Sequence, residues 1–283
     1  MDVDRASQTA VFAAQVRAAH ALLDPDPVFE DHYALALADA TEADVHDLFA
    51  LIPVACARVA RVLPVQRARF VDEEVGRAVS RGVDQYVLLG AGLDSFAWRR
   101  PDLMAELDLF EVDHPATQAW KQRRMEALGL SRPPRAHFIG TDLAAGEDLS
   151  EGLGAVTFDP ARTSIWSWLG VIVYLEVEAI ATKMSEIAEL SASGSRLIVS
   201  YTVTPDLMDP GSREFADLAR AAARGAGEPH LSVFTPAEIE GLARDAGWAS
   251  VHSVDPSSFA PWFSKRCDGL APASYEWLLV ADA

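Results

Sequence analysis

From residue 85 onward, short runs of apolar residues alternate with longer stretches in which apolar positions recur every three or four residues. Such short runs, closed by glycine, proline or aspartate, are typical of strands buried on both faces of a parallel sheet. The predicted strands cover residues 86–89, 109–112, 136–139, 164–168, 195–203, 248–254 and 275–280, and the predicted helices cover residues 94–100, 115–128, 175–190 and 236–247. This alternation predicts an α/β fold with a mostly parallel sheet covered on both faces.

The last two predicted strands break the alternation. A stretch that carries proline and serine, and that lacks helical periodicity, separates residues 248–254 from residues 275–280. Parallel neighbours need a long crossover, usually a helix, whereas an antiparallel strand does not. We therefore expect an irregular connection here and an antiparallel final strand.

The first 82 residues are predicted to form a helical cap over one end of the sheet. Helical patterns cover residues 4–24 and 32–37, and Thr41 with Asp44 forms a capping box that opens a third helix. Because proline breaks helices, the last helix of the cap is predicted only after Pro64, over residues 65–80. We expect one domain, made of this cap, a nucleoside-binding core (83–204), a lid insertion (205–234) and the C-terminal part of the sheet (235–283).

The first predicted strand runs directly into the turn Gly90-Ala91-Gly92. Glycine lets the backbone turn sharply and lets a ligand approach the amides. The second predicted strand ends at Asp113, at about the spacing expected between a nucleotide-binding turn and a carboxylate that holds a ribose. We therefore predict a nucleoside site at this turn.

Other interpretations of the same residues stay open. The glycine turn could bind nothing, and Asp113 could cap the helix that begins at His114-Pro115. Glu111 lies on the same strand face as Asp113 and could hold the ribose instead.

The turn does not favour a dinucleotide. Ser95 stands where a third glycine is expected, and Asp94 puts a negative charge where pyrophosphate would bind a helix start. A nicotinamide oxidoreductase is therefore disfavoured. A cofactor without phosphates, such as S-adenosylmethionine with its cationic sulfonium, fits better.

Further candidates follow the third and fourth strands. Asp142 and Leu143 are placed to receive an adenine ring, although Asp142 could equally be a turn residue. Trp168 and Leu169 end the fourth strand, at the edge where ligands of open α/β sheets bind, although a tryptophan there could instead fill the core. Tyr174 follows on the next turn, where its hydroxyl could reach a substrate.

Two more side chains come from outside the predicted core. Arg67, just ahead of the first strand, could pair as a fork with the methionyl carboxylate of the cofactor, or be solvated like most helix arginines. His230, in the predicted lid, is the best placed general base, although surface loop histidines are common.

Composition narrows the function further. The net charge of −18 argues against binding to nucleic-acid phosphates. The two cysteines lie far apart and the seven histidines form no i, i+4 pair, so we expect no metal site. No apolar segment is long enough to span a bilayer and no basic patch precedes an apolar run, so we expect a soluble, cytoplasmic protein without membrane partners.

Four segments carry a resemblance to a known family. QYVLLGAGLDSFAWRRP, LFEVDHPATQAWKQRR, TDL and SWLGVIVYL resemble the leucine carboxyl methyltransferase family, and most of all its bacterial branch, which includes polyketide O-methyltransferases. The resemblance implies a class I methyltransferase (Rossmann-like) fold of seven strands with an antiparallel last strand, and S-adenosyl-L-methionine as the cofactor. Carried over by position, the family's cofactor residues fall on Arg67, the glycine turn, Asp113, Asp142 and Leu143.

The chain departs from the pattern of eukaryotic members at two positions. These members carry a glutamate that contacts the cofactor where this chain has Leu169, and an arginine for the substrate carboxylate where it has Ala144. The resemblance without that arginine implies a small-molecule substrate rather than a protein C-terminus.

The expected function is therefore methyl transfer to a carboxylate or hydroxyl oxygen of a small molecule, in secondary metabolism, by a monomer or homodimer without nucleic-acid or membrane partners. The alternative is a protein that binds the cofactor without methyl transfer, for ligand binding or cyclisation. The predicted cofactor-binding residues are Arg67, Gly90, Ala91, Gly92, Asp113, His114, Asp142, Leu143, Trp168 and Leu169, and the predicted catalytic residues are Tyr174 and His230.

Overall fold

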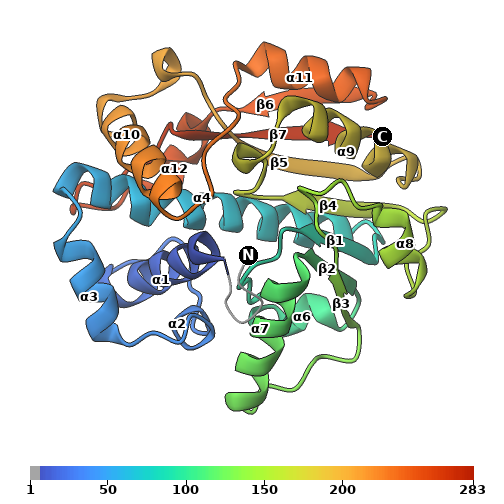
Figure 1. Cartoon of the computed structure of the whole chain (residues 1–283), viewed down its shortest axis with the longest axis horizontal. Coiled ribbons are helices and arrows are strands. Elements are labelled where there is room, and N and C mark those ends of the chain that lie inside the picture. Colours follow the sequence, from blue (N-terminus) through green and yellow to red (C-terminus); the bar gives the residue numbers. More distant parts are fainter. Residues whose placement is uncertain (1–6) are drawn as a thin grey trace.

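The structure, a computed structural model, describes residues 7–283 and is built on one seven-stranded sheet (Figure 1). The strands are β1 (Gln85–Leu89), β2 (Asp108–Asp113), β3 (Ala136–Gly140), β4 (Ser164–Trp168), β5 (Arg196–Thr202), β6 (Ser250–Val254) and β7 (Glu276–Asp282). Their order in the sheet is β3-β2-β1-β4-β5-β7-β6, and β7 runs antiparallel to both of its neighbours. The predicted mostly parallel sheet with an antiparallel last strand is confirmed.

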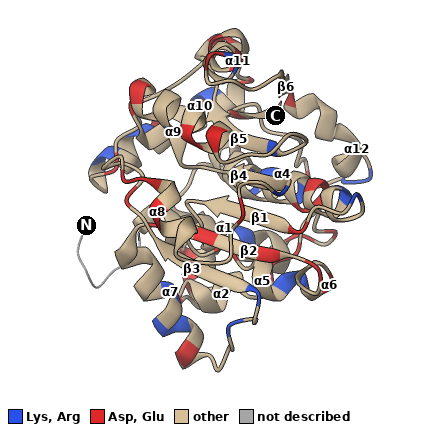
Figure 2. Ribbon diagram, turned by 90° about the vertical axis from the view of Figure 1, so that its right-hand side faces the viewer, with Lys and Arg blue, Asp and Glu red and all other residues tan. Residues whose placement is uncertain are grey.

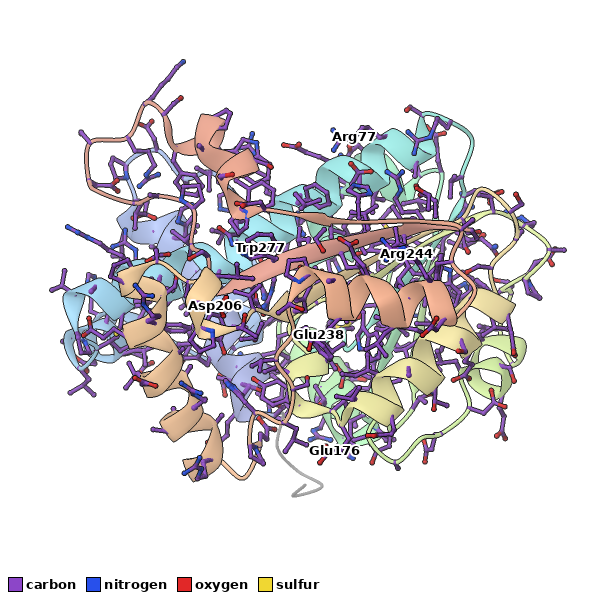
Figure 3. All side chains as sticks on the ribbon, turned by 90° about the horizontal axis from the view of Figure 1, so that it is seen from above. Arg77, Glu176, Asp206, Glu238, Arg244 and Trp277 are labelled. Atoms are coloured by element: carbon purple, nitrogen blue, oxygen red, sulfur yellow. The ribbon has the colours of Figure 1, made fainter. Side chains whose placement is uncertain are left out.

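Side chains that alternate along each strand point to opposite faces of the sheet and pack into a hydrophobic core layer on each face. Tyr86 and Leu88 of β1 pack with α4 (Val54–Val79), α5 (Phe96–Arg99) and α6 (Pro101–Met104) on one face. Val87 and Leu89 pack on the other face with α8 (Leu149–Gly154), α9 (Val177–Glu189) and α11 (Pro236–Asp245). Figure 3 shows α11, marked by Glu238 and Arg244, beside β7, marked by Trp277. Burial on both faces explains why the strand sequences are almost continuously apolar.

The helical cap lies at one end of the sheet, where α1 (Gln8–Leu23), α2 (Ala34–Leu37) and α3 (Glu42–Ala50) gather with α10 (Pro210–Gly225) and α12 (Ala260–Phe263) (Figure 1). The predicted capping box at Thr41 and Asp44 is present at the start of α3. The predicted helix over residues 4–24 matches α1 where the chain is described, and its residues 4–6 lie outside the described part.

The prediction that a helix begins after Pro64 was wrong. The helix α4 has 26 residues and continues without interruption through Pro64. Proline has no N–H group, so the carbonyl of Ala60 lacks its usual helical donor. Pro64 is nevertheless buried, and α4 packs against both α1 and α10. Burial of this long apolar face outweighs the loss of one hydrogen bond.

Three further differences concern local turns and short helices. The predicted helix 94–100 is two helices, α5 and α6, because Pro101 starts a new first turn. The connection before β7, predicted as irregular, contains the 3-10 helix η3 (Pro256–Phe259) and α12. The predicted lid, residues 205–234, contains η2 (Pro205–Leu207) and α10, whose packing on α4 the sequence pattern did not reveal.

Charged residues are spread over the surface, and Lys and Arg occur on several helices and loops rather than along one stripe (Figure 2). Among residues 7–283, no helix has both the length and the apolar character that a bilayer crossing needs.

One ion pair between β2 and the following helix is completely buried. Lys121 of α7 (Pro115–Ala127) donates to the Glu111 carboxylate of β2, and both side chains are 0% exposed. The ammonium nitrogen of Lys121 also lies 5.6 Å from the ring centroid of Trp98 and 5.7 Å from that of Phe138. Burial raises the pKa of Glu111 to about 7, although the neighbouring ammonium opposes this shift. Glu111 is therefore held in a buried ion pair within the core, so its carboxyl group is not available to a ribose.

Replacing Lys121 by Met should lower the free energy of unfolding by about 3–5 kcal/mol, because it leaves a buried carboxyl without its counter-ion. The loss should be larger at pH 8 than at pH 5, since folding then requires protonation of a carboxyl that is ionised in the unfolded chain. Urea unfolding followed by circular dichroism measures both effects. The double variant K121M/E111Q is the control and should recover most of the stability. A single variant within about 1 kcal/mol of the wild type would contradict the assignment.

Candidate active site

The sheet order reverses between β1 and β4, so the connections that follow these two paired strands lead to helices on opposite faces of the sheet. Open α/β sheets bind ligands at such a point, and we call the region beside these two strand ends the crevice. Gly90 follows β1 with φ of 67°, and Gly170 follows β4 with φ of 68°. A Cβ atom on Gly90 would collide with Val171, and one on Gly170 would collide with the guanidinium of Arg67. Glycine is therefore required at both strand ends by its left-handed backbone and by the space around it.

Asp113 ties the glycine turn to the neighbouring strand. One oxygen of its carboxylate accepts the N–H of Gly92, and the other accepts the N–H of His114 at 2.6 Å. Burial raises the pKa of Asp113, while the two amide donors act in the opposite direction. Each carboxylate oxygen keeps a further lone pair, so the group remains able to accept hydrogen bonds from a ligand.

Two alternative interpretations of this region are wrong. The N-cap of α7 is His114, whose Nδ1 accepts the N–H of Ala116 at 3.1 Å, so Asp113 is not the capping residue. Glu111 lies on the same strand face but is held by Lys121 in the core. Asp113 is the acid of β2 that stands beside the turn.

The residues after β3 form the next side of the crevice. Oδ1 of Asp142 accepts the N–H groups of Ala144 and Ala145, both at 3.0 Å, so Asp142 does act as a turn residue. Its other oxygen, Oδ2, lies 3.7 Å from Nε2 of His114. Leu143 is buried in the core beside this turn. The turn thereby directs one carboxylate oxygen towards His114 and the crevice.

Arg67 reaches the crevice from α4. Its Nη1 donates to both carboxylate oxygens of Glu276, at 2.9 and 2.7 Å. Glu276 is the first residue of β7 and follows Arg67 by 209 residues. The guanidinium lies against Gly170. Arg67 therefore lies beside the turn after β4, and in this structure its carboxylate partner is Glu276 of the protein itself.

Trp168 and Leu169 differ in their surroundings. The Trp168 side chain is fully buried among core residues, so it fills the core. Leu169 is partly buried and contacts both core layers.

The two predicted catalytic side chains are in contact. The rings of Tyr174 and His230 pack edge to face with centroids 5.4 Å apart. Nδ1 of His230 lies 3.3 Å from the hydroxyl of Tyr275. Burial lowers the pKa of His230 and raises the pKa of Tyr174, so near pH 7 the imidazole is neutral and the phenol is protonated. The sequence pattern did not indicate Tyr275 and Glu276 as site residues, because they lie at the start of the last strand and carry no local motif.

The start of α1 covers the glycine turn. A Cβ atom on Gly92 would lie 3.2 Å from the Cβ of Ala10. The hydroxyls of Ser7 and Thr9 donate to the carboxylate of Glu228, at 3.2 and 2.8 Å. The cap and the segment 205–234 therefore meet over the crevice, an arrangement that no sequence signal indicated.

The strand order, the glycine turn after β1 and the acid at the end of β2 are those of the class I methyltransferase fold. Similar solved structures are a DUF574 family protein from Streptomyces avermitilis (TM-score 0.65, 13% identity, 99% of this chain and 98% of that one) and a "putative methyltransferase" from Thermobifida fusca YX (TM-score 0.62, 17% identity, 99% and 96%). These likenesses concern the fold.

The sequence comparisons identify the family. The model of the leucine carboxyl methyltransferase family matches residues 10–188, and the chain belongs to this family. The "Putative S-adenosyl-L-methionine-dependent methyltransferase YktD" of Bacillus subtilis is 32% identical over 213 residues, which cover 74% of this chain and 68% of the relative. A relative of the same description from Parafrankia sp. (strain EAN1pec) is 34% identical over 233 residues, which cover 77% and 73%.

Replacing Gly90 by Ala should destabilise the protein more than the same change at Gly82. Both glycines have positive φ, so each variant should lose about 1–3 kcal/mol through backbone strain. Only at Gly90 does the new methyl group meet Val171, which should add about 1–3 kcal/mol. Chemical denaturation of both variants, and of G90A/V171A, gives the comparison. Equal losses at the two glycines would show that the close packing is not required.

Proposed function

We propose that this protein transfers a methyl group from S-adenosylmethionine to an oxygen atom of a small molecule. The observation that carries the proposal is the Asp113 carboxylate, which stands beside the glycine turn with lone pairs left for a ligand. Membership of a family named for methylation at a carboxyl group supports oxygen as the acceptor atom. The fold alone would not distinguish this activity from others.

The residues around the crevice fit S-adenosylmethionine. At Gly90 and Gly170 the space that a Cβ atom would take is occupied by Val171 and by the guanidinium of Arg67, so the two glycines bring Arg67 close to the strand ends where the cofactor would bind. Asp113 would accept the ribose hydroxyls, and Asp142 with Leu143 would hold the adenine. Arg67 would hold the methionyl carboxylate, exchanging Glu276 for it. We infer that the glycine turn, His114 and the backbone of Trp168 and Leu169 complete the contact surface.

A dinucleotide fits this crevice less well. Oδ1 of Asp94 accepts the N–H of Phe96 at 2.6 Å, so a carboxylate already occupies the start of α5. This helix has only four residues and offers little dipole for a pyrophosphate.

S-adenosylmethionine supplies the methyl group: the acceptor oxygen bonds to the methyl carbon while the carbon–sulfur bond breaks and leaves its electron pair on sulfur. The chain contributes mainly by positioning the acceptor for this displacement. For a hydroxyl acceptor, the neutral imidazole of His230 would take the proton, and Tyr174 would donate a hydrogen bond. We propose that segment 205–234 acts as the lid that brings His230 over the acceptor.

Replacing Asp113 by Asn should weaken the binding of S-adenosylmethionine and of S-adenosylhomocysteine roughly 10- to 100-fold, because hydrogen bonds to a charged group contribute about 1.5–3 kcal/mol. Isothermal titration calorimetry measures the change. Asp102→Asn is the matched control, since this carboxylate lies on the surface with Arg100. Unchanged binding by D113N would reject the proposed site. If the wild type binds S-adenosylmethionine but releases no S-adenosylhomocysteine with any acceptor, the alternative of a binding protein without methyl transfer is favoured.

Arg67 and Glu276 should respond in opposite directions. Arg67→Met removes the proposed partner of the methionyl carboxylate and should weaken cofactor binding at least about tenfold. Glu276→Gln removes the competing carboxylate and should leave binding as tight as in the wild type, or tighten it. Calorimetric titration with S-adenosylhomocysteine compares the two. Equal weakening in both variants would assign the ion pair a structural role only.

A further inference from the structure

A separate pocket of about 180 Å³ lies at the carboxyl end of β5, enclosed by η2, α10 and the segment Leu231–Val233. Figure 3 shows this corner, where Asp206 marks η2 and Trp277 marks β7. Most of its walls are apolar, and they include Val203, Met208 and Ala216. Leu231 and Val233 line the pocket and are 44% and 46% exposed, so it opens to solvent on their side.

The pocket shares a wall with the cofactor crevice. The N–H of Leu231 donates to the carbonyl of Val173 at 2.7 Å, and the hydroxyl of Ser232 donates to the carbonyl of Ile172 at 2.8 Å. These carbonyls belong to η1 (Ile172–Tyr174), which directly follows the turn after β4. His230 lines the pocket and packs against Tyr174, so this aromatic pair stands between the two spaces.

The polar groups of the pocket suit an uncharged ligand that carries a hydroxyl group. Among the lining residues, Arg220 is the cation, and its guanidinium already donates to Asp217 at 2.7 Å and to the carbonyl of Ala216 at 3.3 Å. A ligand carboxylate would therefore have to compete with Asp217 for this cation. The Thr202 hydroxyl is 4% exposed and has no hydrogen-bond partner of good geometry, although it lies near enough to the Tyr275 phenol to lower that group's pKa.

Tyr275 leaves one nitrogen of His230 available. When Nδ1–H of His230 donates to the Tyr275 hydroxyl oxygen, the lone pair of the neutral ring is on Nε2. A ligand hydroxyl can donate its hydrogen bond to this nitrogen and accept one from Thr202.

Size limits the ligand further. A closed apolar cavity of about 150 Å³ holds benzene, so a pocket slightly larger than this accommodates one ring with one or two small substituents. We propose that this pocket is the acceptor site of the methyl transfer and that it takes a neutral single-ring alcohol, such as a substituted phenol, with its hydroxyl directed at His230. This inference rests on the proposed function and specifies its acceptor.

Three probes that share one ring test the class of acceptor. In ¹⁹F NMR titrations with S-adenosylhomocysteine present, 4-fluorophenol should bind at least about tenfold more tightly than 4-fluorobenzoate, because Arg220, the cation of the pocket, is already paired with Asp217. It should also bind more tightly than 4-fluorotoluene, which cannot use the polar groups. Tightest binding of 4-fluorobenzoate, or no binding of any probe by a protein that binds S-adenosylhomocysteine, would overturn the proposal.

Three variants test whether 4-fluorophenol binds in this pocket. Ala216→Phe fills the pocket and should abolish 4-fluorophenol binding, while Ala222→Phe, the same change on the exposed part of α10, should not. Thr202→Val keeps the shape and should weaken 4-fluorophenol severalfold without affecting 4-fluorotoluene. Binding of 4-fluorophenol that survives A216F or that T202V does not weaken would also overturn the proposal. Calorimetry with S-adenosylhomocysteine alone is measured for every variant, so failure of cofactor binding, which refutes the proposed function, is distinguished from failure of the acceptor site.

Discussion

The hydrogen bond from the Gly92 amide to the Asp113 carboxylate is the interaction on which the site depends. It joins the turn after β1 to the end of β2. The amides of Gly90 and Ala91 also donate to the carbonyl of Val112 in β2, at 2.8 and 3.1 Å. The turn is therefore held against its neighbouring strand before any ligand arrives. A cofactor that meets such a prearranged turn loses less conformational freedom on binding than one that must order it.

The antiparallel strand has a consequence beyond the sheet. Because β7 runs antiparallel to β5, it begins at the carboxyl end of β5. Its first residue, Glu276, and the preceding Tyr275 therefore lie at the same end of the sheet as the crevice. Glu276 pairs there with Arg67, and Tyr275 with His230. The last strand thus contributes one group to the proposed cofactor side and one to the proposed acceptor side. Tyr174 and His230 lie where the two sides meet.

The departures from the family pattern can now be placed. Ala144 donates its amide to Asp142 within an exposed turn, so this position contributes no cation to the crevice. Leu169 contacts both core layers and adds no charge after β4. On the proposed acceptor side, Arg220 is already paired with Asp217. The proposal of a neutral small-molecule acceptor rests on these features.

The sequence alone determined the strands, the glycine turn and the antiparallel end, because the spacing of apolar residues, the turn residues and the lengths of the connections are local properties of the chain. Only the tertiary structure decided which acid of β2 stands beside the glycine turn, since Glu111 is paired with Lys121 in the core while Asp113 accepts the amide of Gly92. It also decided that α4 continues through Pro64, where packing on α1 and α10 outweighs a lost hydrogen bond. The partners of Arg67 and His230 lie 209 and 45 residues away, and pairing over such separations is set by strand order, which no local pattern encodes.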